Sequence, residues 1–138
     1  MTKFWQTWLT IWCAAVALFG LLLAGAAFEP TQGPAQILFA LMGPTGTATF
    51  DTQARFAIGL MGAVTLGWGL TTWVLIAAAP TLPPAVWTRL TAAITVWFVI
   101  DSTISIATGY WLNAVSNTIF VAAYLLPILR TGVLQAPR

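Results

Sequence analysis

The sequence predicts an all-α integral membrane protein, folded as a four-helix bundle in a single transmembrane domain over residues 1–138. Composition carries most of this prediction. Of 138 residues, 59% are hydrophobic and 6% are charged, whereas a soluble domain carries roughly 25% charged residues. The mean hydropathy is +0.90. So few charges cannot coat a water-facing surface, and the composition therefore excludes a soluble globular enzyme.

Four segments reach the roughly 20 mostly apolar residues that a spanning helix needs. The first segment has no charged residue between Lys3 and Glu29, and the second ends directly before Pro80. The third contains Asp101, and Arg130 bounds the fourth. The first segment exceeds the 7–15 residues of a signal-peptide core, so we expect a retained anchor. The predicted spans are residues 4–28, 56–79, 85–108 and 112–129.

The connections predict how these helices follow one another. Residues 80–84 and 109–111 are too short for anything but antiparallel neighbours. Residues 29–55 form one long outer loop, in which the mostly apolar residues 35–42 are too short to span. We expect a short helix there, either in the membrane interface or capping the bundle. Asp51 or Thr52 is placed to cap the helix that follows.

Basic residues predict the orientation. Lys3, Arg89, Arg130 and Arg138 fall on one side of a four-span arrangement, and Arg55 falls on the other. The positive-inside rule then places both termini in the cytoplasm. The long loop faces outward.

Tryptophans near the predicted helix ends are typical of interface anchors. Trp5, Trp8 and Trp12 share a stripe of the first helix. Trp87 lies at the start of the third helix, and Trp111 lies beyond its other end, just before the fourth. We expect these five to anchor the protein at the membrane surfaces.

Three further tryptophans, Trp68, Trp73 and Trp97, lie deeper in the predicted spans. They are expected in the core or against lipid. Contact with a quinone or pigment stays open as the alternative.

A row of small residues, Gly59, Ala63 and Gly67, recurs every four positions in the second predicted span. Such a row lets another helix approach closely. Gly20 and Ala24 offer a shorter stretch of the same kind in the first span. The partner helix is expected within this bundle, with another subunit as the alternative.

One polar cluster lies inside the predicted spans. Asp101 and Ser105 share a face of the third helix, Asn113 and Asn117 share a face of the fourth, and Asp101 and Asn117 lie at similar depth. Arg55 is the nearby cation expected to reach Asp101. One interpretation is a hydrogen-bonded network that fixes helix register. The other is an outward-facing pocket in which Asp101 binds a cation, a proton or a polar headgroup.

Other chemistry is excluded by what the sequence lacks. It has no histidine and a single cysteine, Cys13. No zinc cage, haem histidine or histidine-based nucleophile pair can form, so no cofactor is expected through His or Cys ligands, and no metal site. A net charge of +2 does not point to nucleic acid.

The stretch WFVIDSTISIATGYWLNAVSNTIFVAAYLLPILR, residues 97–130, resembles the C-terminal half of small uncharacterised bacterial four-helix inner-membrane proteins. The resemblance rests on Asp101-Ser102-Thr103, Leu112-Asn113 and Ser116-Asn117. It implies a bacterial inner membrane and no particular activity.

These observations lead us to expect a non-catalytic accessory or structural subunit of a larger membrane complex, such as a respiratory or photosynthetic assembly. Its partners would be membrane lipids and protein subunits. The alternative is a small transporter, or a lipid- or quinone-binding protein, that uses the Asp101 cluster. A membrane enzyme ranks last, because no nucleophile–base pair is visible.

Overall fold

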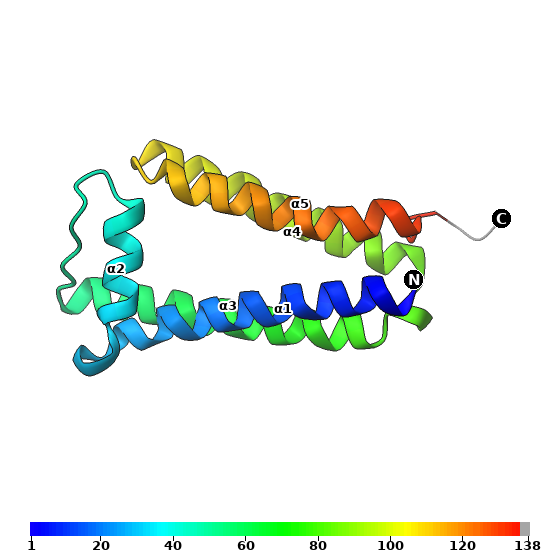
Figure 1. Cartoon of the computed structure of the whole chain (residues 1–138), viewed down its shortest axis with the longest axis horizontal. Coiled ribbons are helices and arrows are strands. Elements are labelled where there is room, and N and C mark those ends of the chain that lie inside the picture. Colours follow the sequence, from blue (N-terminus) through cyan, green and yellow to red (C-terminus); the bar gives the residue numbers. More distant parts are fainter. Residues whose placement is uncertain (136–138) are drawn as a thin grey trace. The chain divides into compact units, whose positions relative to one another are not determined.

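The computed structural model describes residues 1–135, in which the regular elements are all helices and no strand is present. Within this range the α-helices are α1 (Lys3–Ala24), α2 (Gly33–Met42), α3 (Thr52–Ala77), α4 (Pro84–Ala107) and α5 (Trp111–Thr131) (Figure 1). Short 3-10 turns follow α1 and α3. The four longer helices, α1, α3, α4 and α5, are each long and apolar enough to cross a membrane. The all-helical class is therefore confirmed, and each of the four predicted spans corresponds to a helix that could cross a membrane.

Helix α1 ends at Ala24, four residues before the end of its predicted span. Helix α3 begins at Thr52, four residues before its predicted span and at the capping signal that the sequence offered. The carboxylate of Asp51 explains the early start, because its Oδ1 accepts a hydrogen bond of 2.7 Å from the backbone N–H of Ala54. This bond satisfies one of the amide groups left without a partner at a helix N-terminus. Asp51 is thus the capping residue, and Arg55 lies inside the helix.

The helices are grouped into two compact units. The α1–α3 unit comprises Cys13–Trp73, which covers most of α1, all of α2 and most of α3. The α4–α5 unit comprises Met1–Trp12 and the chain from Val74 onward, so it also holds the first turns of α1 and the last turn of α3.

In the α1–α3 unit, the two long helices run antiparallel with their backbones in close contact. A Cβ atom built on Gly62 would lie 2.1 Å from the backbone nitrogen of Ala24, and one built on Gly20 would lie 2.3 Å from that of Leu66. No side chain fits at such distances. This line of close contact between α1 and α3 is called the seam. Gly69 extends it to Ala17 at one end, and Gly59 extends it to Ala27 at the other.

The seam includes only part of the expected small-residue row. Gly59 lies in it, but Ala63 and Gly67 are exposed, and a Cβ on Gly67 would meet nothing within 4 Å. Gly67 therefore does not take part in the packing of α3 against α1. Helical geometry gives the reason: at 3.6 residues per turn, steps of four drift about 40° each around the axis. Gly59, Gly62, Leu66 and Gly69 alternate steps of three and four, which keeps them facing one neighbour.

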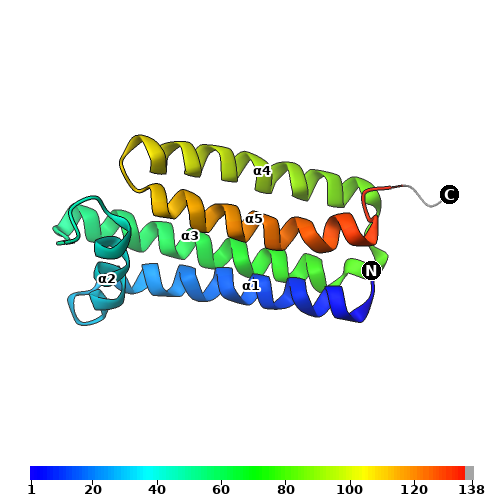
Figure 2. The same cartoon turned by 45° about the horizontal axis from the view of Figure 1, so that its top comes forward.

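Helix α2 lies across one end of α1 and α3 (Figure 2). Its Ala35 is fully buried in a cluster with Leu23, Ala26 and Ile58. Phe39 of α2 meets Phe50 edge-on, with ring centroids 5.5 Å apart. The short helix expected in the outer loop is present, and it closes the core of the α1–α3 unit.

In the α4–α5 unit, α4 and α5 form an antiparallel hairpin (Figure 2). The turn needs Gly109, whose φ of 85° is a conformation that other residues rarely adopt. It closes with a 2.7 Å hydrogen bond from the backbone N–H of Tyr110 to the carbonyl of Ser105. Further along, the hydroxyls of Thr91 and Tyr124 lie 3.0 Å apart and join the two helices.

The start of α1 packs onto this hairpin through side-chain donors. The indole N–H of Trp12 donates to the carbonyl of Phe120 at 2.9 Å, and that of Trp8 donates to Ala123 at 2.8 Å. Gln6 donates to the carbonyl of Ile76, in the last turn of α3. Each donor therefore meets a main-chain oxygen of another helix.

These contacts revise the role expected for the tryptophans. Trp12 is 5% exposed and Trp87 is 1% exposed. Side chains buried this deeply cannot lie at a membrane surface, so the expectation of interface anchors does not hold for these two. Trp111 is 59% exposed, which keeps it compatible with an anchor, and Trp8 and Trp5 are partly exposed.

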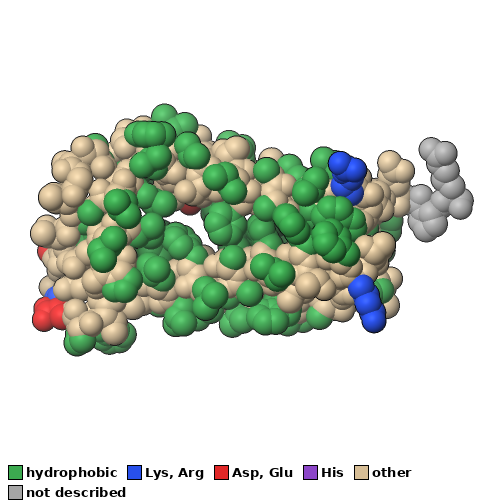
Figure 3. All heavy atoms as spheres, in the orientation of Figure 1, with side chains coloured by type: hydrophobic (Ala, Val, Ile, Leu, Met, Phe, Trp, Pro, Cys, Tyr) green, Lys and Arg blue, Asp and Glu red, His purple; other side chains and the backbone are tan. Residues whose placement is uncertain are grey.

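The outer faces of the long helices are apolar. Groups of hydrophobic side chains are spread along the helices on the visible face, and lysine and arginine lie near helix ends (Figure 3). On α4, five large residues are more than half exposed: Val96, Val99, Ile100, Ile104 and Ile106. Water would oppose such exposure, whereas lipid tails accept it. The outer surface therefore suits a hydrocarbon environment.

Candidate functional site: a polar cluster on the α4–α5 hairpin

The expected polar cluster forms on the α4–α5 hairpin. Asp101 and Ser105 lie one turn apart near the C-terminal end of α4, and Asn113 and Asn117 lie one turn apart near the start of α5. The short turn at Gly109 brings these two stretches side by side. Ser105 and Asn117 are each 6% exposed, while Asp101 and Asn113 are partly exposed.

One oxygen of the Asp101 carboxylate organises the cluster. Its Oδ1 accepts hydrogen bonds from the Nδ2 atoms of Asn117 at 2.7 Å and Asn113 at 2.8 Å. The Ser105 hydroxyl lies 3.3 Å from the same oxygen and 2.7 Å from the backbone carbonyl of Asp101. Asn113 also donates to the Ser105 hydroxyl at 2.9 Å. These bonds connect side chains of α4 with side chains of α5, so the network holds the two helices of the hairpin together.

Ser102 is a member of the cluster that the spacing argument missed. Its hydroxyl oxygen lies 3.4 Å from Nδ2 of Asn117. Ser102 follows Asp101 directly, and adjacent positions point about 100° apart on a helix. The pattern of Asp101 and Ser105, four residues apart, therefore leaves it out, and only the position of α5 brings Ser102 and Asn117 together.

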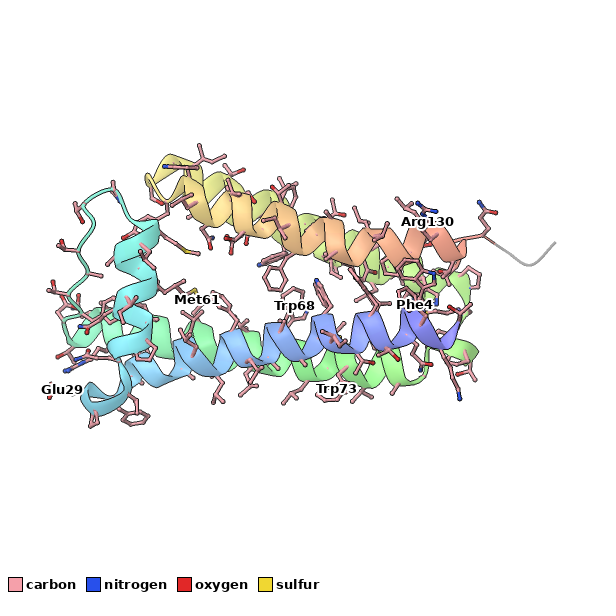
Figure 4. All side chains as sticks on the ribbon, viewed as in Figure 1. Phe4, Glu29, Met61, Trp68, Trp73 and Arg130 are labelled. Carbon is pink, nitrogen blue, oxygen red and sulfur yellow. The ribbon has the colours of Figure 1, made fainter. Side chains whose placement is uncertain are left out.

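Arg55 has a different partner from the one expected. Its guanidinium pairs with the carboxylate of Glu29, and both residues belong to the α1–α3 unit. Glu29 lies in the 3-10 turn after α1 and is labelled in Figure 4. The pair therefore links the start of the outer loop to the first turn of α3, and the interpretation of Arg55 as the partner of Asp101 is replaced by this one.

The two carboxylate oxygens of Asp101 differ in their surroundings. The hydrogen bonds to the carboxylate group of Asp101 all go to Oδ1, and Oδ2 receives none from the part of the chain that the structure describes. Within residues 1–12 and 74–135, no lysine or arginine forms an ion pair with this carboxylate. The donors to this carboxyl group are the amides of Asn113 and Asn117 and the hydroxyl of Ser105.

The deeper tryptophans differ in their exposure. Trp73 is 41% exposed and projects outward from α3 (Figure 4), as expected for lipid contact. Trp68 and Trp97 are partly buried. Trp97 lies in α4, four residues before Asp101, and therefore on the same face of that helix.

Residues 1–135 contain no group of three or more His, Cys, Asp or Glu side chains that could hold a metal ion. The cluster offers a carboxylate, two amides and two hydroxyls, which can accept hydrogen bonds or attract a cation. No protein-family model matches this chain, and comparison with curated proteins and with solved structures finds no match either. The fold and the cluster define a class only: a helical chain with four potential membrane spans and an acidic side chain within one of them.

Proposed function

We propose that this chain is a non-catalytic structural subunit of a larger membrane complex, such as a respiratory or photosynthetic assembly. The observation that carries the proposal is the Asp101 network. Its side chains hydrogen-bond one another across α4 and α5, as do Thr91 and Tyr124, so polar groups within these helices serve to hold them together. A chain built this way supplies shape and surface, with lipid and neighbouring subunits covering its apolar faces.

We place the protein in a bacterial inner membrane, as a four-helix bundle with both termini in the cytoplasm. Lys3, Arg89 and Arg130 support this orientation, because they lie at the start of α1, the start of α4 and the end of α5. Arg138, the fourth residue of that argument, lies outside the described residues.

A second candidate is a small transporter, or a lipid- or quinone-binding protein, that uses the Asp101 cluster. The observation that favours it is the difference between the two carboxylate oxygens of Asp101: Oδ1 receives hydrogen bonds from Asn113 and Asn117, and Oδ2 receives none from the described residues. A residue serving only to hold a hairpin would gain from using both, since unpaired polar atoms within a membrane span are costly.

Extraction from the native membrane in mild detergent tests the first candidate. We expect the protein to migrate within a large complex and to co-purify with other polypeptides. The absorption spectrum of the same fraction would report haem or pigment in that complex. Migration as a colourless monomer or dimer would contradict the subunit proposal and favour the second candidate.

A further inference from the structure

We propose that one end of the α4–α5 unit binds the headgroups of anionic phospholipids. Three cationic side chains define this basic end: Lys3 at the start of α1, Arg89 in the second turn of α4 and Arg130 in the last turn of α5. All three belong to the same compact unit, so their arrangement does not depend on where the α1–α3 unit lies. The proposal is independent of the function proposed above and requires only that the chain lies in a lipid bilayer.

The pairing of α4 with α5 places the two arginines near one level. The hydroxyls of Thr91 and Tyr124 lie 3.0 Å apart, so these two positions are level in the antiparallel hairpin. Arg89, two residues before Thr91, is therefore level with about residue 126 of α5. Arg130 lies about four residues beyond that position, which is about 6 Å along the helix axis.

The packing of α1 on α5 brings the lysine to the same level. The indole N–H of Trp8 donates to the carbonyl of Ala123, and α1 runs antiparallel to α5 at this contact. Lys3, five residues before Trp8, is therefore level with about residue 128 of α5. It lies within about 3 Å of Arg130 along the helix axis. Three helices thus each contribute one cation to a single layer at this end.

No acidic side chain balances this layer. Among residues 1–12 and 74–135, the only Asp or Glu is Asp101. It lies about 18 Å further along α4 than Arg89. All three cations are exposed, and none of them forms an ion pair with another described residue. The basic end therefore presents uncompensated positive charge to its surroundings, and an anion is the ligand it attracts.

Apolar side chains beside the cations favour a lipid as the source of that anion. Phe4, next to Lys3, is 64% exposed, and Leu129, next to Arg130, is 69% exposed. Figure 4 labels Phe4 and Arg130, which lie at this end of the unit. A phospholipid joins a phosphate to acyl chains, so its headgroup can contact the cation while its hydrocarbon contacts the apolar neighbour. Free phosphate, nucleic acid or an acidic peptide would gain nothing from these exposed apolar groups.

Phosphatidylglycerol, which carries one net negative charge, is a suitable probe, and phosphatidylcholine with the same acyl chains is the neutral reference. The purified full chain is reconstituted into phosphatidylcholine vesicles that contain a trace of either lipid in spin-labelled form. Electron paramagnetic resonance measures the fraction of labelled lipid that the protein immobilises. We expect phosphatidylglycerol to associate about fivefold more strongly. Equal association of the two lipids would overturn the proposal.

Variants assign the preference to the basic end. The triple variant Lys3→Gln, Arg89→Gln, Arg130→Gln removes the three charges, and the two lipids should then associate about equally. The double variant Glu29→Gln, Arg55→Gln is the matched control, because it removes a guanidinium of the other unit together with the carboxylate that pairs with it. This control should keep the preference of the wild type. A triple variant that keeps the full preference would overturn the proposal.

Salts distinguish a lipid from a free anion as the ligand. Inorganic phosphate should lower the preference no more than sodium chloride of the same ionic strength does, because both act only by screening. A selective loss in phosphate would overturn the assignment to lipid. Elution volume and melting temperature in detergent check the fold of each variant. If the triple variant does not fold, the three single variants decide the question, since each should lower the preference.

Discussion

The indole N–H of Trp8 donates a 2.8 Å hydrogen bond to the carbonyl oxygen of Ala123, an oxygen whose usual helical donor is missing because residue 127 is proline. Proline has no N–H to offer four residues back along a helix. Pro127 is nevertheless buried within α5, and the helix continues to Thr131. Trp8 therefore fills a gap in the backbone hydrogen bonding of α5, and the start of α1 is tied to that helix.

This relationship predicts a coupling between two positions. Trp8→Phe should lower the free energy of unfolding by about 1 kcal/mol, because the Ala123 carbonyl then loses its donor. Pro127→Ala supplies the missing N–H, so the loss caused by Trp8→Phe should be smaller in that background. Unfolding in detergent, followed by circular dichroism, measures all four proteins of the cycle. Equal losses in both backgrounds would show that Trp8 does not act through this carbonyl.

The seam between α1 and α3 predicts a sharp contrast between two glycines of α3. Gly62→Leu places a side chain where a Cβ would already lie 2.1 Å from the Ala24 nitrogen, and it should cost at least about 1–3 kcal/mol of stability. Gly67→Leu meets open space and should leave the isolated chain as stable as the wild type. Thermal unfolding of the two variants in detergent makes the comparison. Equal destabilisation would contradict the seam.

Gly67→Leu also tests the subunit proposal. Small residues let helices from different chains approach closely, and a bulky side chain prevents this. If Ala63 and Gly67 face another subunit, Gly67→Leu should release the folded chain from the native complex. Native gel migration of solubilised membranes reports the release. Thr65→Leu, at another position on α3, provides a control for added bulk on that helix.

The Asp101 network predicts an asymmetry between removing one partner and removing both. Asn117→Leu should cost about 1–3 kcal/mol, because the Asp101 carboxyl group loses one of its donors. Replacing Asp101 by leucine as well removes the orphaned group, and part of the lost stability should return. Unfolding of the single and double variants in detergent gives the coupling energy. Strict additivity would indicate that Asn117 does not act through the carboxylate.

The cap of α3 predicts a local effect. Asp51→Ala should destabilise the first turn by about 1 kcal/mol, since the Ala54 N–H loses its acceptor. Asp51→Ser, which keeps a capping oxygen, should retain most of the stability. Hydrogen exchange over residues 52–56 is the suitable readout. Faster exchange in both variants would mean that the cap does not depend on a side-chain acceptor.

Several features could be predicted from the sequence because they depend on local properties. Hydropathy and length identify the four helices that could span a membrane, since a chain in hydrocarbon must satisfy its backbone polar groups within a helix or a closed barrel. Asp51 and the apolar run in the outer loop predicted the start of α3 and the presence of α2. The cluster of Asp101 with Asn113 and Asn117 followed from a short turn, which leaves two adjacent helices little freedom in register.

Tertiary structure decided everything that depends on how a helix is rotated about its axis and which element faces it. Gly62 and Gly69 pack against α1 while Gly67 does not, because the seam follows alternating steps of three and four rather than a run of fours. Trp12 and Trp87 are buried although their positions near helix ends are typical of anchors. Arg55 pairs with Glu29. The order of residues in the sequence does not predict this pair, because it depends on how the outer loop folds.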